Sequence, residues 1–264
     1  MKKLLLNLFA VILLSTSITG GLKAQTNVSH EVGALFGISS LQTDYGISGN
    51  FAAANQASMS FGFSYYMKFF GSQYNWRSGS SYFSEHFKIK AEFLYINNSN
   101  LEHEGFDPDG NFAAELEAHT GSVKMYDLGV NLEYYFIELE DYSSFFKQSG
   151  SVNPFVSLGL HYTYAQPDMF VNDVSLKGQE EPYEELIPKW QEGAVFLEEQ
   201  NIFSASAGAG VRFGLDAVDL VLEGRYQYFF SDRLEGLDAP DDPGNLNNDT
   251  MVFINMGIVY VFGK

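Results

Sequence analysis

The sequence predicts an all-β protein, an eight-stranded antiparallel transmembrane β-barrel with long extracellular loops and a cleaved N-terminal signal peptide. Three observations predict it. Segments in which apolar and polar residues alternate recur along the 264 residues, separated by stretches rich in turn-forming residues. Within these segments the charged residues lie on one face and apolar residues on the other, a pattern that would also fit a secreted soluble sandwich or barrel with its apolar face turned inward. The chain also begins with an export signal.

We expect residues 1–25 to form a secretory signal peptide and residues 26–264 to form a single barrel domain. Two lysines precede an apolar run over residues 4–14, and Ala24-Gln25 offers a cleavage site. A membrane anchor is the alternative, but the run is short for a transmembrane helix, which needs about 20 residues.

The composition argues against several classes of function. The chain has 33 acidic residues against 15 lysines and arginines, so no nucleic-acid partner is expected, because phosphate contacts need basic side chains. It has no cysteine, which excludes disulfides, thiolate metal sites and a cysteine nucleophile. The sequence shows no phosphate-binding glycine loop and no metal-type histidine pair, so we expect neither a cofactor nor a metal.

Each expected strand has a length suited to crossing a bilayer at a tilt. The eight strands are Ser29–Ser39, Ala57–Phe69, Glu85–Asn97, Ser122–Ile137, Pro154–Ala165, Ile202–Gly214, Ala217–Phe230 and Met251–Phe262. Aromatic residues cluster near strand ends, as they do where barrel strands meet the membrane surface. Long connections on the outer side and short ones on the inner side are typical of outer-membrane barrels. The long ones are expected over residues 40–56, 98–121, 166–201 and 231–250.

Several strands carry charges of both signs on their polar face. A barrel would turn the apolar face to lipid and these charges into its lumen, where unpaired charges are costly, so we expect acids to pair with bases. The expected lumen charge network comprises Lys88, Lys90 and Glu92 in the third strand, Asp127 and Glu133 in the fourth, Arg212 in the sixth, and Glu223 and Arg225 in the seventh. Because side chains just fill an eight-stranded barrel, no wide pore is expected.

The last strand carries a distinct pattern. A polar residue, Asn255, is followed by Gly257 and then by Tyr260 and Phe262 at alternate positions. This resembles the insertion signal on the final strand of bacterial outer-membrane barrels. It predicts an outer-membrane location, with outer-membrane lipid and the barrel-assembly machinery as partners.

One pair of residues raises the question of catalysis. His161 and Thr163 are expected to face the lumen near the outer end of the fifth strand, where outer-membrane lipid deacylases use a serine–histidine pair. Here the hydroxyl belongs to threonine, and no acidic group that could orient His161 is evident nearby in sequence. Packing of polar lumen side chains is therefore the favoured interpretation, and no catalytic residue is expected.

Three outer loops are candidate binding surfaces. The third contains many glutamates together with Tyr183 and Trp190. These two aromatic residues would serve as anchors for a protein or a glycan. A solvated acidic loop is the alternative. Residues 107–111 of the second loop begin like a calcium loop but place glycine fourth and lack the closing glutamate, so a turn is favoured. The fourth loop offers oxygen ligands without a recognisable spacing, which leaves weak divalent-cation binding open.

Several strings occur together between residue 30 and the C-terminus. They are His30–Gly33, Asp44–Gly46, His86–Lys90, Asn153–Gly159, Lys189–Gln191, Tyr226–Asp232 and Gly236-Leu237, followed by the final strand. Together they resemble an uncharacterised outer-membrane β-barrel family of Flavobacteriia and other Bacteroidetes, and Gln227–Asp232 is the most specific string. The resemblance implies the fold and the compartment, and it implies no catalytic residues.

The first functional hypothesis is a small closed outer-membrane barrel with a structural or surface-binding, non-catalytic role. The second is an accessory subunit of an envelope machine, such as the type IX secretion and gliding apparatus. Under this hypothesis the barrel would bind another protein of the cell envelope. The hypothesis is motivated by the lineage that the resemblance implies and by two longer inner connections, near residues 70–84 and 138–153. A lipid-modifying enzyme acting through His161 and a narrow pore are the remaining alternatives.

Overall fold

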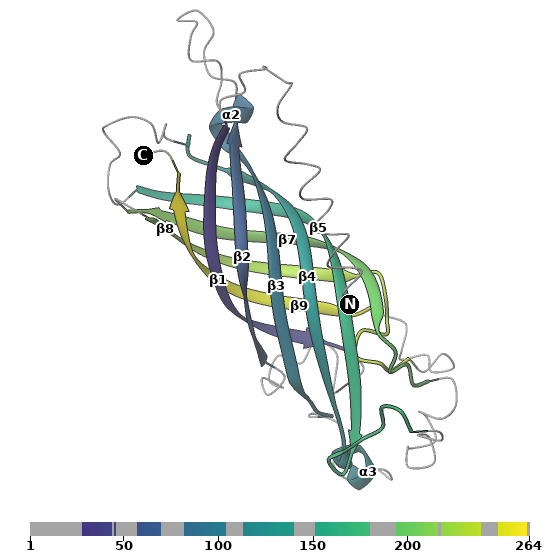
Figure 1. The fold of residues 1–264 in the computed structure, drawn as a ribbon. Coiled ribbons are helices and arrows are strands. Elements are labelled where there is room, and N and C mark those ends of the chain that lie inside the picture. The colour runs from purple at the N-terminus through teal and green to yellow at the C-terminus, as the bar shows by residue number, and fades with distance from the viewer. Residues whose placement is uncertain are drawn as a thin grey trace, which may run out of the picture.

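Within the described residues, eight long strands form a barrel wall, and one short strand and two short helices lie in the connections (Figure 1). The computed structural model describes residues 28–43, 45, 57–69, 82–103, 113–139, 151–179, 194–215, 218–238 and 248–262. The wall strands are β1 (Val28–Gln42), β2 (Ala57–Phe69), β3 (Phe87–Leu101), β4 (His119–Tyr135), β5 (Ser151–Val171), β7 (Gln200–Gly214), β8 (Val218–Phe229) and β9 (Thr250–Val261). The short elements are β6 (Val174–Ser175), α2 (Tyr82–His86) and α3 (Ala113–Ala118).

The wall is closed and antiparallel throughout. Along the sheet the strands follow the order β4-β3-β2-β1-β9-β8-β7-β5, and pairing between β4 and β5 closes it. β6 adds only a two-residue hairpin to the end of β5. All eight predicted strands are present in the predicted order, so the predicted eight-stranded antiparallel barrel is confirmed.

We call the end at which β1 begins and β9 ends the inner end of the barrel. α2 lies at this end and α3 at the opposite, outer end (Figure 1). Among the helices that the structure describes, none is long and apolar enough to cross a membrane.

Several predicted strand boundaries are wrong, and β5 shows one reason. The prediction ended this strand at Ala165, whereas β5 continues to Val171. Its pairing with β7 stops at Ala165 opposite Gln200, and β6 pairs with it only from Phe170, so Pro167, opposite Val123 of β4, has a strand neighbour on one side only. Proline lacks a backbone N–H and is tolerated where a strand has no neighbour on one side.

The ends of β3 and β4 also differ from the prediction. Glu85 and His86 belong to α2 and do not begin the third strand. β4 begins at His119, three residues before the predicted start, and ends at Tyr135, two residues before the predicted end. Parts of the predicted second and third outer loops are thus regular structure, since strands and α3 extend into them.

The outward face of the wall is apolar and the inward face is largely polar. Leu158 and Leu160 on β5 are each 69% exposed, whereas the neighbouring Ser157 and His161 are buried. Apolar surface directed outward with charges inside is favourable in hydrocarbon and unfavourable in water. A closed barrel also leaves no unpaired strand edge in the lipid. The protein is therefore a transmembrane barrel of the outer membrane, with the predicted orientation of its faces.

The lumen is filled differently along its length. Toward the outer end, apolar side chains from the strands and the outer connections pack into one cluster, the outer apolar layer, which includes Leu35, Leu94, Ile96, Met125, Phe229, Leu234, Leu237 and Phe253. Toward the inner end, charged residues occupy the lumen beside a smaller cluster that contains Tyr66, Tyr135, Phe155, Val221 and Val259. The charged groups thus lie below a water-excluding layer.

Candidate functional site

Two clusters of ion pairs cross the lumen. The inner charge cluster comprises Glu31 of β1, Lys88 of β3, Arg212 of β7 and Asp219 of β8. Lys88 Nζ donates to Glu31 Oε1 at 2.7 Å, and Arg212 Nη2 donates to Glu31 Oε2 at 2.5 Å. Arg212 Nε donates to Asp219 Oδ2 at 2.8 Å. Glu31 therefore connects β1 with both β3 and β7, since each of its oxygens accepts from a different cation.

The central charge cluster lies further from the inner end. Its members are Lys90, Glu92, Glu133, Glu223 and Arg225. Lys90 Nζ lies 2.7 Å from Glu223 Oε2, 3.4 Å from Glu92 Oε2 and 3.6 Å from Glu133 Oε1. Arg225 pairs with Glu92, whose Oε1 also accepts a hydrogen bond from Asn131 Nδ2 at 2.9 Å. Lys90 is thus surrounded by three carboxylates from three strands.

Aromatic rings lie against three of these cations. The guanidinium of Arg225 lies 4.5 Å from the centre of the Phe253 ring, and that of Arg212 lies 5.2 Å from the Tyr66 ring. Lys88 Nζ lies 5.6 Å from the Tyr135 ring. Such cation–π contacts stabilise desolvated cations, so the rings support the same charges that the carboxylates pair with.

All eight residues of the predicted lumen network face the lumen, and none is more than 3% exposed. The structure brings five of them together in the central charge cluster. Lys88 and Arg212 have acidic partners that the prediction left out of the network, Glu31 and Asp219. Both acids lie at strand positions whose side chains alternate toward the lumen, and this alternation could have predicted that they belong to the network. Which charges meet across the lumen depends on register and tilt, which alternation does not encode.

Asp127, the eighth residue, belongs to a polar group around His161, which adjoins the central charge cluster because His161 Nδ1 lies 3.9 Å from Glu92 Oε1. His161 Nδ1 lies 2.7 Å from Asp127 Oδ1, and His161 Nε2 lies 2.9 Å from Ser206 Oγ. Thr163 Oγ1 donates to Asp127 Oδ2 at 2.6 Å. Sequence reasoning found no acidic orienter for His161 and considered only threonine as the hydroxyl; the structure supplies Asp127 from β4 and Ser206 from β7. We call Asp127, His161 and Ser206 the His161 triad.

A glycine makes room for this triad. A Cβ atom at Gly129 of β4 would lie 2.3 Å from His161 Nδ1, well inside any normal contact distance. The imidazole therefore lies over β4 at the one kind of residue that leaves space for it. Gly159 on β5 does the same for Asn131, whose Oδ1 would lie 2.0 Å from an added Cβ.

The His161 triad has the hydrogen-bond order of a hydroxyl, a base and an orienting carboxylate. Its position does not suit a substrate. Ser206 is 6% exposed, His161 is buried, and both lie in the lumen below the outer apolar layer. Ser206 Oγ also lies 3.3 Å from Asn131 Oδ1, which accepts from the hydroxyl. The geometry therefore fits a buried polar network better than a reactive centre.

The predicted insertion signal lies on β9 with its residues on both faces. Asn255 and Gly257 face the lumen, and Asn255 is buried. Tyr260 and Phe262 face outward, 52% and 51% exposed, with their rings edge to face at 5.4 Å. The aromatic pair at the end of β9 therefore lies on the outward, lipid-facing side of the wall.

At the outer end, a hydrogen-bonded group joins the segment before β7 to β5. Glu199 accepts from the Tyr164 hydroxyl, and its Oε1 accepts from Gln166 Nε2 at 3.0 Å. These hydrogen bonds lower the pKa of Glu199. Tyr183 and Trp190, the predicted anchors of the third loop, lie outside the described residues, as do the signal peptide and residues 107–111.

No family model and no curated protein matches the chain, so the resemblance to the Bacteroidetes barrel family stays a prediction. Among solved structures, the chain is similar to Neisserial surface protein A at 12% identity and a TM-score of 0.42, with 89% of this chain and 98% of that chain covered. It is similar to Ail of Yersinia pestis at 13% identity and a TM-score of 0.41, with 89% of this chain and 99% of that chain covered. It is similar to a major outer membrane protein of Thermus thermophilus at 12% identity and a TM-score of 0.43, with 89% of this chain and 100% of that chain covered. At such identities the likeness concerns the fold alone.

Proposed function

We propose that this protein is a closed, non-conducting outer-membrane barrel with a structural or surface-binding, non-catalytic role. One observation carries the proposal: every residue of the two charge clusters is at most 3% exposed, and the outer apolar layer covers them. A water-filled channel is lined by polar side chains that contact water, whereas the side chains of the two charge clusters are buried. Function is then left to the lipid-facing wall and to the two ends.

Planar-bilayer recording tests the closed lumen. The purified barrel, checked for folding by its altered gel mobility before boiling, should give no conductance steps above those of protein-free bilayers. A trimeric porin reconstituted in the same way serves as the positive control. Steady, protein-dependent steps would show a continuous aqueous path and would overturn the proposal.

The His161 triad motivates a second candidate, a hydrolase that acts on an ester or a lipid. Under that function a fluorophosphonate probe should label the folded barrel at Ser206, because such probes report an activated serine. We expect no labelling of the wild type. Labelling that disappears in Ser206→Ala, with the barrel still folded, would favour the enzyme. Unchanged lipid A composition after deletion would count against it.

The partners follow from the same proposal. Outer-membrane lipid would cover the apolar wall, and the barrel-assembly machinery would read the last strand during insertion. An envelope protein partner, as expected for an accessory subunit of a secretion or gliding machine, is motivated by the family resemblance. Affinity purification from cross-linked cells tests it, and recovery of the barrel with no stoichiometric partner would speak against that role.

A further inference from the structure

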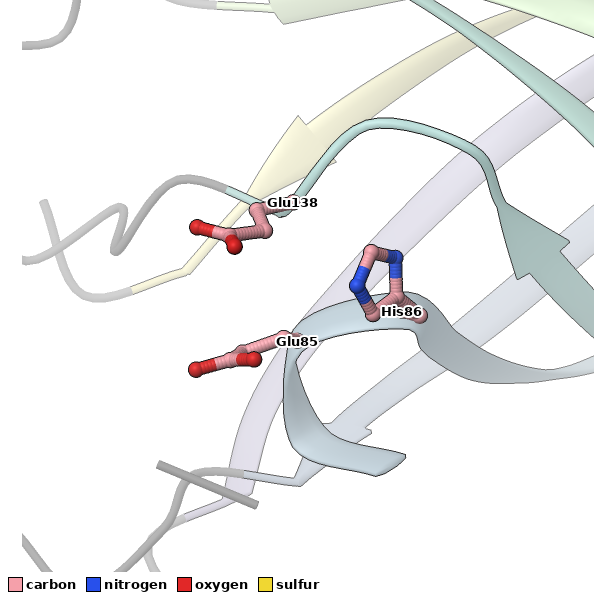
Figure 2. A group of neighbouring side chains, drawn as sticks. All are labelled: Glu85, His86 and Glu138. Atoms are coloured by element: carbon pink, nitrogen blue, oxygen red, sulfur yellow. The ribbon is translucent and has the colours of Figure 1, made fainter. Parts of the chain in front are cut away.

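Three potential metal ligands meet at the inner end of the barrel, outside the lumen clusters. Glu85 and His86 are the last two residues of α2, and Glu138 follows β4. One ligand atom from each lies within 4.8 Å of the others. Figure 2 shows both carboxylates extending to the same side of the His86 ring. No sequence motif predicts this group, because Glu138 is distant along the chain from Glu85 and His86.

The orientation of His86 is fixed by its surroundings. Its Nδ1 lies 2.8 Å from the backbone carbonyl oxygen of Tyr135, so Nδ1 carries the proton and donates to it. The other nitrogen, Nε2, then carries the lone pair. Metal-binding histidines commonly donate their second ring nitrogen to a carbonyl or carboxylate in this way. The rings of Tyr82 and Tyr134, centred 4.3 and 5.7 Å from the His86 ring, hold it in place.

The backbone holds the two glutamates near each other independently of any ion. Leu139 N donates to the carbonyl oxygen of Glu85 at 2.7 Å, which fastens the segment after β4 to α2. The Glu138 side chain is exposed, so it can change rotamer and move toward His86. Ligand atoms around a tetrahedral zinc ion are about 3.3 Å apart, so only a side-chain rotation is needed.

We propose that Glu85, His86 and Glu138 bind one divalent transition-metal ion, with Zn²⁺ as the best match to the ligand set. An imidazole nitrogen and two carboxylates suit zinc, whereas calcium and magnesium take oxygen ligands. Three protein ligands leave a fourth position for water. The ion would tie the connection between β2 and β3 to the connection between β4 and β5. This goes beyond the proposed function, because an ion at the inner rim leaves the lumen closed.

Calorimetric titration of the folded, untagged, chelator-treated barrel with ZnCl₂ tests the site. His86→Asn removes Nε2 but keeps an N–H that can donate to the Tyr135 carbonyl. Glu138→Gln removes one carboxylate from an exposed position and should not affect folding. Glu117→Gln is the matched control, because Glu117 is an exposed glutamate on α3 at the opposite end.

We expect one zinc ion per chain in the wild type and in Glu117→Gln, and a loss of affinity of about tenfold or more in each of the other two variants. CaCl₂ should bind much more weakly than ZnCl₂ at this site. Three results would overturn the proposal: no zinc binding by the wild type, equal binding by Glu138→Gln, or calcium binding as tight as that of zinc.

Discussion

His161 Nδ1 lies 2.7 Å from Asp127 Oδ1, and this contact joins β5 to β4 in the middle of the lumen. Asp127 Oδ2 also accepts from Thr163 at 2.6 Å and from Gln227 Nε2 at 3.0 Å. One carboxylate thus gathers side chains from β5 and β8 onto β4. Removing it would take one hydrogen-bond acceptor from each of three buried side chains, of which Gln227 would keep a second acceptor in Ser204 Oγ.

Asp127→Ala should lower the free energy of unfolding by about 3 kcal/mol, because His161, Thr163 and Gln227 lose a buried carboxylate as their hydrogen-bond acceptor. Ser206→Ala, which removes only the hydroxyl at the other side of His161, should cost about 1 kcal/mol. Urea unfolding of the refolded barrel in lipid vesicles, followed by far-ultraviolet circular dichroism, measures both. Equal small losses in the two variants would contradict a carboxylate-centred network.

Lys90 is the cation that compensates three carboxylates, so its removal should strongly destabilise the barrel. Lys90→Met should cost about 3–5 kcal/mol of unfolding free energy, since Glu92, Glu133 and Glu223 would repel one another in a dry lumen. Lys124→Met, on the exposed face of β4, is the matched control and should change stability by about 1 kcal/mol or less. If the two variants unfold alike, the lumen is better solvated than the contacts indicate.

The space over Gly129 can be tested with a single methyl group. Gly129→Ala should destabilise the barrel by about 1–3 kcal/mol, because the new Cβ would overlap the His161 ring and force it to move. Gly224→Ala is the control, since the nearest atom to its Cβ would be 3.9 Å away. Thermal unfolding monitored by the boiling-dependent gel shift compares the two, and a stable Gly129→Ala barrel would contradict the placement of His161.

The contact between Glu199 and β5 should weaken in acid. The pKa of Glu199 is lowered in the folded protein by hydrogen bonds from Tyr164 and Gln166. A group with a depressed folded pKa stabilises the fold fully above its unfolded pKa, about 4.3 for glutamate, and loses that contribution as the pH falls through the folded value. Protection of residues 194–199 from hydrogen exchange should therefore fall below about pH 4, relative to Tyr164→Phe at the same pH.

Tyr164→Phe removes one of the two donors to Glu199, so the protection of residues 194–199 should already be lower at neutral pH and should change less with acid. A pH dependence that is identical in the two proteins would assign the effect to other acidic groups of the outer connections.

The alternation of side chains determined much of what could be predicted. Arg212 and Glu223 were assigned to the lumen because each lies on the polar face of a strand whose other face is apolar, and both are buried there. Their partners were not predictable in the same way. Lys88 pairs with Glu31, two strands away around the wall, and this depends on barrel shear, which no local pattern records.

The His161 triad and the inner-rim ligands show the same limit. Ser206 and Asp127 lie on strands adjacent to β5, but only the register places them at the two ring nitrogens of His161. Glu138 lies near His86 because the neighbouring Leu139 N donates to the Glu85 carbonyl oxygen, a contact between connections that alternation within strands does not predict. Sequence patterns therefore predicted the faces of the strands and missed the contacts between them.

The central claim, a lipid-facing wall around a closed lumen, is tested most directly by thiol accessibility at two adjacent positions of β5. The chain has no cysteine, so single cysteines at Ser157 and Leu158 are unambiguous. In lipid vesicles, a fluorophore on Leu158→Cys should be quenched by brominated acyl chains and not by aqueous iodide. Ser157→Cys should resist a charged thiol reagent until the barrel is unfolded. Quenching by iodide at 158, or rapid reaction at 157 in the folded barrel, would contradict the claim.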